Sequence, residues 1–294
     1  MGTNKRFGNA IIRKSTDGGV TWTEPSDSSN GVLVSDRRCH TAPMPMLEHN
    51  GRLWRTMEDV DGAEHWGAWF EAFMMSVPVE ADLLNADNWI LSNRVKVDTS
   101  WKNGKFKGFL EGNAVVLPDG QVADVLRAEL LPHGETAAVI RISDDGQTAS
   151  FDPQTDFVPF PGGNVKFTVR YDDESEKYWT ISNWVAPGYS VHREYMALSC
   201  SSDFKTWEIK SIVMFAPPLC GQGFQYVDWV FDGEDIAAVS RTAWDDGLGG
   251  AEALHDANLM TFHRIQAFRT QTMEDSVTDP SRLGIDPSKR ILLP

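Results

Sequence analysis

The chain has 294 residues, of which 27 are Lys or Arg and 42 are Asp or Glu, so its formal charge is −15. That charge argues against nucleic acid or an anionic membrane surface as a partner, and no run of about 18 or more apolar residues is present to span a bilayer. The three cysteines, Cys39, Cys200 and Cys220, fit neither a disulfide framework nor a CxxC metal motif, and we expect them to be small buried residues.

The first residues lack the apolar core of a secretory signal. The chain as given therefore carries no targeting signal and is expected in the cytoplasm, or in the periplasm or outside the cell if an N-terminal segment precedes it.

Short stretches of alternating apolar and polar residues follow one another, separated by turn residues, which predicts an all-β fold rather than βαβ units. Before residue 39 we expect two strands, NAIIRKS and VTWTEP. Four later segments, starting at Cys39, Glu111, Gly163 and Gln225, each read as a strand, a tight polar turn and a second strand. Three of these turns contain Asn-Gly or Asp-Gly, the strongest short hairpin signal.

Two further strands follow each hairpin, the last of them a short piece near Phe268, so the repeat predicts four-stranded antiparallel blades. We expect a five-bladed β-propeller over residues 1–270 whose first blade is incomplete at the N-terminus. Its parts are an outer half-blade at 1–38 and complete blades at 39–98, 107–160, 161–216 and 222–270. The tail, 271–294, does not read as strands, and only Val79 to Asp87 reads as a helical turn.

The two strands before residue 39 are joined by a specific motif, Ser15 to Trp22, which reads SxDxGxTW. It resembles the Asp-box of sialidases and other BNR-repeat propellers. We expect Asp17 to bond the turn backbone and Trp22 to be buried between sheets, because the motif is a structural clip.

The resemblance implies carbohydrate chemistry on a propeller. It implies arginines that bind a substrate carboxylate, a Tyr nucleophile paired with a Glu, and a separate Asp acid; Tyr226 is the candidate nucleophile. The RIP-type arginine segment of the family's first blade is absent from this sequence.

Matched positions in the four repeats are polar where a propeller core would carry small apolar residues, which predicts a polar pocket at the axis. The inner strands start with His40, Glu111, Asn164 and Tyr226. The second strand ends with Arg55, Glu58 and Asp59 in the first repeat and with Arg127 and Glu129 in the second. It ends with Asn183 in the third repeat and with Arg241 in the fourth.

A further cluster, Leu254 to Asn258, precedes the third strand of the last blade and could place His255 as a proton shuttle. Together these positions give the candidate catalytic residues Glu58, Glu111, Tyr226, His40 and His255. The candidate substrate-binding residues are Arg55, Arg127, Arg241, Asn183, Asp228, Asp256 and Asn258. The three arginines are expected to converge on one oxyanion, because the planar guanidinium suits bidentate binding. Aromatic residues in the loops could stack on sugar rings: Trp66, Trp69, Trp184, Tyr189 and Trp244. No spacing suggests a zinc site or a cofactor.

The sequence therefore predicts a sialidase-like exo-glycosidase that acts on an acidic glycan. Two alternatives stay open. One is a polysaccharide lyase in which Tyr226 or His40 abstracts the C5 proton of a uronic acid; the other is a propeller that binds carbohydrate or protein without catalysis.

Overall fold

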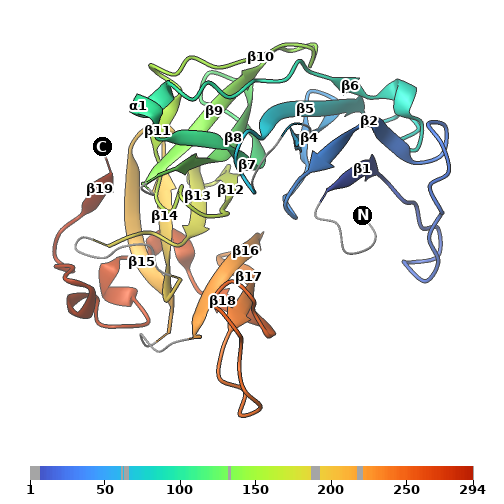
Figure 1. Cartoon of the computed structure of the whole chain (residues 1–294). Helices are drawn as coiled ribbons and strands as arrows, with labels where there is room; N and C mark the ends of the chain where they lie inside the picture. Colours follow the sequence, from blue (N-terminus) through green and yellow to red (C-terminus); the bar gives the residue numbers. More distant parts are fainter. Residues whose placement is uncertain are drawn as a thin grey trace. The chain divides into compact units, whose positions relative to one another are not determined.

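The computed structural model describes residues 7–60, 62, 66–131, 134–186, 193–216 and 221–293 (Figure 1). The chain divides into two compact units. The first consists of Met1–Leu131 and Ala138–Asp156, and the second of Pro132–Ala137 and Phe157–Pro294. Each unit is described by itself below.

The first unit holds two antiparallel sheets. One has the order β1-β2-β4-β5-β6, with β3 also paired to β4, and the other has the order β10-β9-β8-β7. The strands are β1 (Gly8–Ile11), β2 (Val32–His40), β3 (Leu47–His49), β4 (Arg52–Asp59), β5 (Glu71–Pro78), β6 (Ile90–Leu91), β7 (Phe106–Val116), β8 (Val122–Leu130), β9 (Thr136–Ile142) and β10 (Ala149–Ser150), and the short helices are η1 (Ala86–Asn88) and α1 (Trp101–Gly104).

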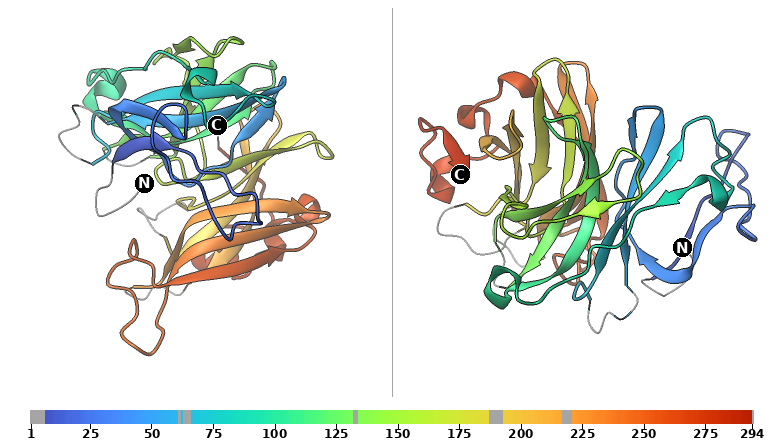
Figure 2. Two further views of the ribbon diagram at one scale, coloured as in Figure 1. Left: turned by 90° about the vertical axis from the view of Figure 1, so that its right-hand side faces the viewer. Right: turned by 90° about the horizontal axis from the view of Figure 1, so that it is seen from above.

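The second unit also holds two antiparallel sheets, with the orders β12-β13-β14-β15-β19 and β16-β17-β18 (Figure 2). The strands are β11 (Phe157–Pro159), β12 (Thr168–Asp172), β13 (Lys177–Ser182), β14 (Tyr195–Ser201), β15 (Trp207–Phe215), β16 (Gly223–Asp232), β17 (Asp235–Ala243), β18 (Leu259–Ile265) and β19 (Ile291–Leu293), and the 3-10 helices are η2 (Phe268–Thr270), η3 (Met273–Asp275) and η4 (Pro280–Leu283).

The fold is all-β, and the four sheets found in the described residues are the blades of a β-propeller; a fifth blade is not confirmed. The four predicted hairpins are β3–β4, β7–β8, β12–β13 and β16–β17, each closed at the expected turn. No helix in the described ranges has the length and apolar character needed to cross a membrane.

The segment before residue 39 differs from the prediction. VTWTEP is not a strand, and β1 pairs instead with β2, where Ile11 lies opposite Val32, so both strands join the sheet of β4, β5 and β6. Asp17 does accept hydrogen bonds from the backbone N–H and hydroxyl of Thr21. Trp22, however, is 55% exposed, so the prediction of burial is wrong. Its indole N–H donates to Gly19 O at 2.9 Å and folds back on its own turn instead of packing between sheets.

Two predictions about the end of the chain are also wrong. The residues near Phe268 form η2 rather than a fourth strand, because Ala267 takes a left-handed conformation with φ 46° that ends the strand geometry. The tail does contribute a strand, since β19 pairs with the edge of β15, and Leu293 lies opposite Trp207. The tail therefore covers an edge that would otherwise leave backbone groups unpaired.

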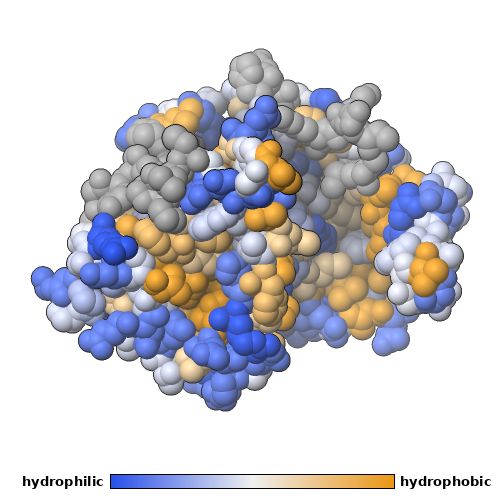
Figure 3. Space-filling view, turned by 90° about the horizontal axis from the view of Figure 1, so that it is seen from below, coloured by the Kyte–Doolittle hydropathy of each residue, from blue (hydrophilic) through white to orange (hydrophobic). Residues whose placement is uncertain are grey.

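Large tryptophans fill the sheet interiors, as Trp54 at 2% and Trp179 at 1% exposure illustrate. Cys39 and Cys200 are buried as expected, and Cys220 lies outside the described residues. Some apolar side chains stay exposed, among them Met260 and Phe262 of β18, and apolar patches lie beside hydrophilic ones on the face in Figure 3.

Two tryptophans of the first unit test this division between core and surface. Trp54→Ala should lower the free energy of unfolding by about 3–5 kcal/mol, because it removes a large buried side chain. Trp22→Ala should change it by only about 0.5 kcal/mol, because that indole is exposed. Urea denaturation followed by circular dichroism measures both, and equal losses would contradict the exposed position of Trp22.

Candidate active site

The centre of the candidate site is a pair formed by His40 at the end of β2 and Glu58 near the end of β4. The two residues lie opposite each other in the ladder, next to the pair of Cys39 and Asp59. The Nδ1 atom of His40 is 2.6 Å from Oε2 of Glu58. The Glu58 side chain is completely buried and that of His40 is 10% exposed. The buried carboxylate therefore fixes the orientation of the imidazole.

The other ring nitrogen of His40, Nε2, has no hydrogen-bond partner among the residues that the structure describes. Burial by itself lowers the pKa of His40. The hydrogen bond to Glu58 and the negative charges of Glu58 and Glu111 outweigh burial and raise the pKa above its ordinary value. The imidazole is thus held in its protonated form to a higher pH than a free histidine, with Nε2–H available as a proton donor.

The second oxygen of Glu58 connects β4 with the neighbouring sheet of the same unit. Its Oε1 accepts a hydrogen bond from the Gly112 N–H at 3.2 Å, and Thr56 Oγ1 donates to the Gly112 carbonyl at 2.6 Å. A Cβ atom at Gly112 would lie 2.0 Å from Oδ1 of Asp124, so only glycine fits here. Both bonds place the segment around Gly112 directly against the His40–Glu58 pair.

Glu111, the residue before Gly112, lies in a bulge of β7. The ladder between β7 and β8 shifts register between Leu110 and Asn113, and Glu111 has φ 57°. A left-handed conformation is unfavourable for a residue with a Cβ atom, and such strain is concentrated at functional sites. The bulge turns the Glu111 carboxylate toward β8, where Oε2 lies 3.5 Å from Nη1 of Arg127.

Arg127 of β8 contacts a second carboxylate as well, because its Nη2 atom lies 2.6 Å from Oε2 of Glu129. The side chain of Glu111 is 2% exposed, that of Arg127 is 12% exposed and that of Glu129 is 18% exposed. Two acidic groups and one cation therefore form a mostly buried cluster beside the His40–Glu58 pair.

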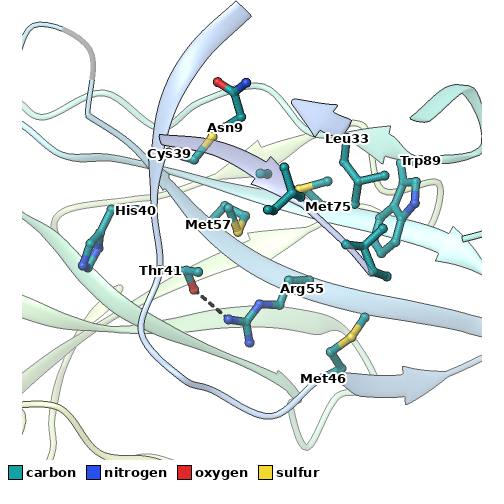
Figure 4. A pocket seen from close by; sticks show the side chains of 13 residues that line it. Asn9, Leu33, Cys39, His40, Thr41, Met46, Arg55, Met57, Met75 and Trp89 are labelled. Carbon is teal, nitrogen blue, oxygen red and sulfur yellow. Dashed lines mark hydrogen bonds between the residues drawn. The ribbon is translucent and has the colours of Figure 1, made fainter. Parts of the chain in front are cut away.

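A pocket of about 300 Å³ opens beside His40 within the first unit. Figure 4 shows His40 and Thr41 at one end and Leu33 and Trp89 at the other. Arg55 lines the pocket, and its guanidinium donates to Thr41 Oγ1 at 2.9 Å, to the Ala42 carbonyl at 2.8 Å and to the Met44 carbonyl. Arg55 thus shapes the 41–46 segment and gives the pocket a positive charge.

The second unit contains a bulge of the same kind at Tyr226. The ladder between β16 and β17 shifts register between Gln225 and Asp228, and Tyr226 has φ 52°. The Arg241 guanidinium lies over the Tyr226 ring at 4.8 Å, and its Nη2 donates to the His255 carbonyl at 2.7 Å. The His255 ring is 6.0 Å from that of Tyr226, and its Nδ1 is 3.1 Å from Oδ1 of Asp256.

The two bulges are equivalent in register. Leu110 pairs with Arg127 in the first unit and Gln225 pairs with Arg241 in the second, and the strained residue follows immediately in each case. The sequence alignment that matched Glu111 with Tyr226 and Arg127 with Arg241 therefore selected residues with the same local geometry.

Three other predicted residues make local structural hydrogen bonds. Asn183 is buried and donates to the carbonyls of Tyr195 and Phe224, and Asp228 accepts from Arg170 at 3.2 Å. Asn258 bonds both backbone groups of Trp244. The convergence of the arginines stays a prediction, since Arg55 and Arg127 belong to the first unit and Arg241 to the second.

Sequence reasoning missed two carboxyl groups whose pKa is raised by burial, Asp124 and Glu135. Asp124 of β8 is 1% exposed, and neither of its carboxyl oxygens has a hydrogen-bond partner among the residues described. Burial, together with the charge of Glu58, raises its pKa well above the ordinary value, while Arg55 opposes the shift. The sequence signal for Asp124 was that it is the single polar residue in the apolar run VADVL. Glu135 accepts hydrogen bonds from the N–H groups of Gly162 and Val185, and burial raises its pKa to about 7. It lies in a loop, and the sequence pattern there gave no signal for it.

Metal binding and thiol chemistry find no support in the described part of the chain. No group of three or more His, Cys, Asp or Glu there could hold a metal ion. Burial raises the pKa of the Cys39 thiol to about 12, so the thiolate is not formed at neutral pH.

Asp124 gives a prediction about pH and stability. Its pKa is higher in the folded than in the unfolded chain, so the contribution of Asp124 to the stability of the wild type is lost as the pH rises above about 4. Asp124→Asn is neutral at every pH and avoids that loss. Its Tm should exceed that of the wild type at pH 8, and the difference should shrink toward pH 4. A Tm difference that grows toward acid pH would contradict the assignment.

Comparison with known proteins relates the chain to solved structures only. No protein-family model and no curated protein matches it. The Hadza microbial sialidase Hz136 superimposes with a TM-score of 0.51 and 13% identity, over 87% of this chain and 43% of that one. A protein of unknown function from Dyadobacter fermentans DSM 18053 gives a TM-score of 0.50 and 13% identity, over 87% and 63%. The chain thus spans about half of the first and under two thirds of the second, and at this identity the likeness concerns the fold.

Proposed function

We propose that the chain is a carbohydrate-active enzyme that hydrolyses glycosidic bonds. The observation that carries this proposal is the His40–Glu58 pair next to the strained Glu111; the Nε2 atom of His40 has no hydrogen-bond partner within the described part of the chain. The likeness of the fold to a sialidase adds support by analogy.

Glycoside hydrolysis needs a group that protonates the leaving oxygen and a carboxylate that stabilises or attacks the anomeric carbon. His40 suits the first role because its neighbours favour the protonated imidazole. Glu111 suits the second role because its side chain lies in the bulge beside the His40–Glu58 pair, with Oε2 3.5 Å from Nη1 of Arg127. Glu58 is completely buried and acts through His40, as a positioning residue.

The substrate that we propose is an acidic glycan. In the first unit, protonated His40 and Arg55 border the pocket. In the second unit, the exposed guanidinium of Arg241 has no carboxylate partner among the described residues. A sialidase-type reaction, with Tyr226 as nucleophile, is the more specific form of this proposal; the bulge that presents Tyr226 beside Arg241 supports it.

One observation favours a second candidate, a polysaccharide lyase. A histidine with Nδ1 held by a carboxylate and Nε2 unpartnered can also remove a carbon-bound proton. That role requires the neutral imidazole, whereas Glu58 favours the protonated one. The two reactions therefore differ in their dependence on pH.

The pH profile of kcat/KM on uronate and sialate oligosaccharides distinguishes them. If His40 is the proton donor, kcat/KM should fall as the pH rises through the raised pKa of His40, and Glu58→Gln should move that fall to lower pH. His40→Ala should reduce kcat/KM by about 10²–10⁴-fold.

New reducing ends without absorbance from unsaturated uronate identify hydrolysis. A rate that rises with pH, together with that absorbance, would instead establish the lyase. If His40→Ala keeps full activity, neither reaction uses this site. His263, which is half-buried in β18, provides the control substitution His263→Ala in the other unit.

The acidic substrate gives a separate prediction at Arg241. Arg241→Ala should raise KM for an acidic oligosaccharide by about tenfold or more, because one charge-assisted contact is lost. A matched neutral oligosaccharide should be affected much less. Arg241→Lys should recover only part of the loss, since Lys cannot form the planar fork. Equal effects on both sugars would contradict carboxylate binding by Arg241.

A further inference from the structure

The His40–Glu58 pair is enclosed by aromatic rings of the same unit. The Trp66 ring lies 5.0 Å from that of His40 at 87°, and the Phe70 ring lies 5.5 Å from it. Phe7 stacks on Trp66 at 5.7 Å with an angle of 15°. Trp66 also meets Phe70 edge to face at 5.7 Å. The indole of Trp66 is thus held in one orientation by its contacts with the rings of Phe7, His40 and Phe70.

Trp66 is nevertheless 44% exposed. Phe70 is fully buried and Phe7 covers part of the indole, so Trp66 presents an ordered apolar surface to solvent next to His40. A rigid aromatic surface loses little conformational freedom when a ligand binds, which makes it an efficient contact.

We propose that Trp66 is the sugar-stacking platform of this site and that it binds one pyranose ring of the substrate. This inference rests on the proposed function and specifies it. The apolar C–H face of a pyranose packs on an aromatic ring while its hydroxyl groups point to water or to polar residues. With the ring centres of Trp66 and His40 5.0 Å apart, a sugar on the indole brings its substituents to the imidazole.

The other loop aromatics do not offer the same arrangement. Trp184 is 2% exposed and belongs to a core cluster, and Trp244 packs against another core cluster near Phe224. Tyr189 lies outside the described residues. Trp69 is 43% exposed in the same loop as Trp66, but the described residues give it no ring contact with His40. Trp69 is therefore a matched control of equal exposure.

Ligand binding can be measured without turnover in the full chain, by quenching of tryptophan fluorescence and by calorimetry. The probes are a uronic acid trisaccharide, sialyllactose and lactose. Trp66→Ala should weaken binding of an acidic probe by about tenfold or more, in line with the usual worth of stacking on an aromatic ring. Trp66→Phe should recover part of the affinity, and Trp69→Ala should bind as the wild type does. The fluorescence change caused by the ligand should disappear in Trp66→Ala alone.

The outcomes separate this inference from the proposed function. Equal losses in Trp66→Ala and Trp69→Ala, or full binding by Trp66→Ala, would overturn the platform even if the enzyme turns over. Binding that depends on Trp66 in a chain without turnover would keep the platform and refute the glycosidase. Absence of binding by the wild type to all three sugars would overturn both. Because Trp66→Ala removes contacts to Phe7 and Phe70, a retained Tm and the recovery in Trp66→Phe exclude a loss caused by unfolding.

Discussion

The candidate site depends on the burial of the Glu58 carboxylate. A completely buried negative charge is costly unless it is hydrogen-bonded and paired, and Glu58 meets both needs with His40 on one oxygen and the Gly112 N–H on the other. The first bond fixes the imidazole and favours its protonated form. The second attaches the bulge of β7 to β4. One carboxylate therefore positions both the His40 imidazole and the segment that carries Glu111.

The bulge at Glu111 has its own requirements. Gly112 must lack a Cβ atom because Asp124 packs against it, and Glu111 must accept a left-handed backbone. The same arrangement recurs at Tyr226 in the second unit, where Arg241 takes the place of Arg127. Repetition of an unfavourable conformation at two aligned positions is better explained by the need to present a side chain than by packing.

Much of the fold could be predicted from the sequence because hairpins are local. The turns at Asn50, Asp119 and Asp232 and the alternating pattern around them predicted three of the four hairpins in the observed places, and the alternating pattern predicted the fourth, β12–β13. The failures involve contacts between distant residues. Pairing of β19 with β15 joins Trp207 with Leu293, which are 86 residues apart, and no local pattern predicts it. The exposed Trp22 follows from its hydrogen bond to Gly19, which the family motif did not predict.

The candidate site shows the same difference between features that a sequence pattern predicts and features that depend on the packed structure. The repeat alignment found His40, Glu58, Glu111 and Arg127, because the same strand position recurs in each blade. It could not show that Glu58 is buried and contacts His40, or that Arg55 donates to backbone carbonyls of the 41–46 segment. Asp124 and Glu135 were missed because burial, not residue type, alters their pKa values. Position along a strand is readable from a repeat, whereas the environment of a side chain depends on the packed structure.

The most direct test of the account is the NMR titration of the histidine rings. We predict that His40 titrates above the ordinary value of about 6.5. His263 should titrate below that value, because burial lowers its pKa. The substitution Glu58→Gln should lower the pKa of His40 and leave that of His263 unchanged. A pKa of His40 at or below that of His263, or one that does not respond to Glu58→Gln, would contradict the assignment of His40 as a proton donor held by Glu58.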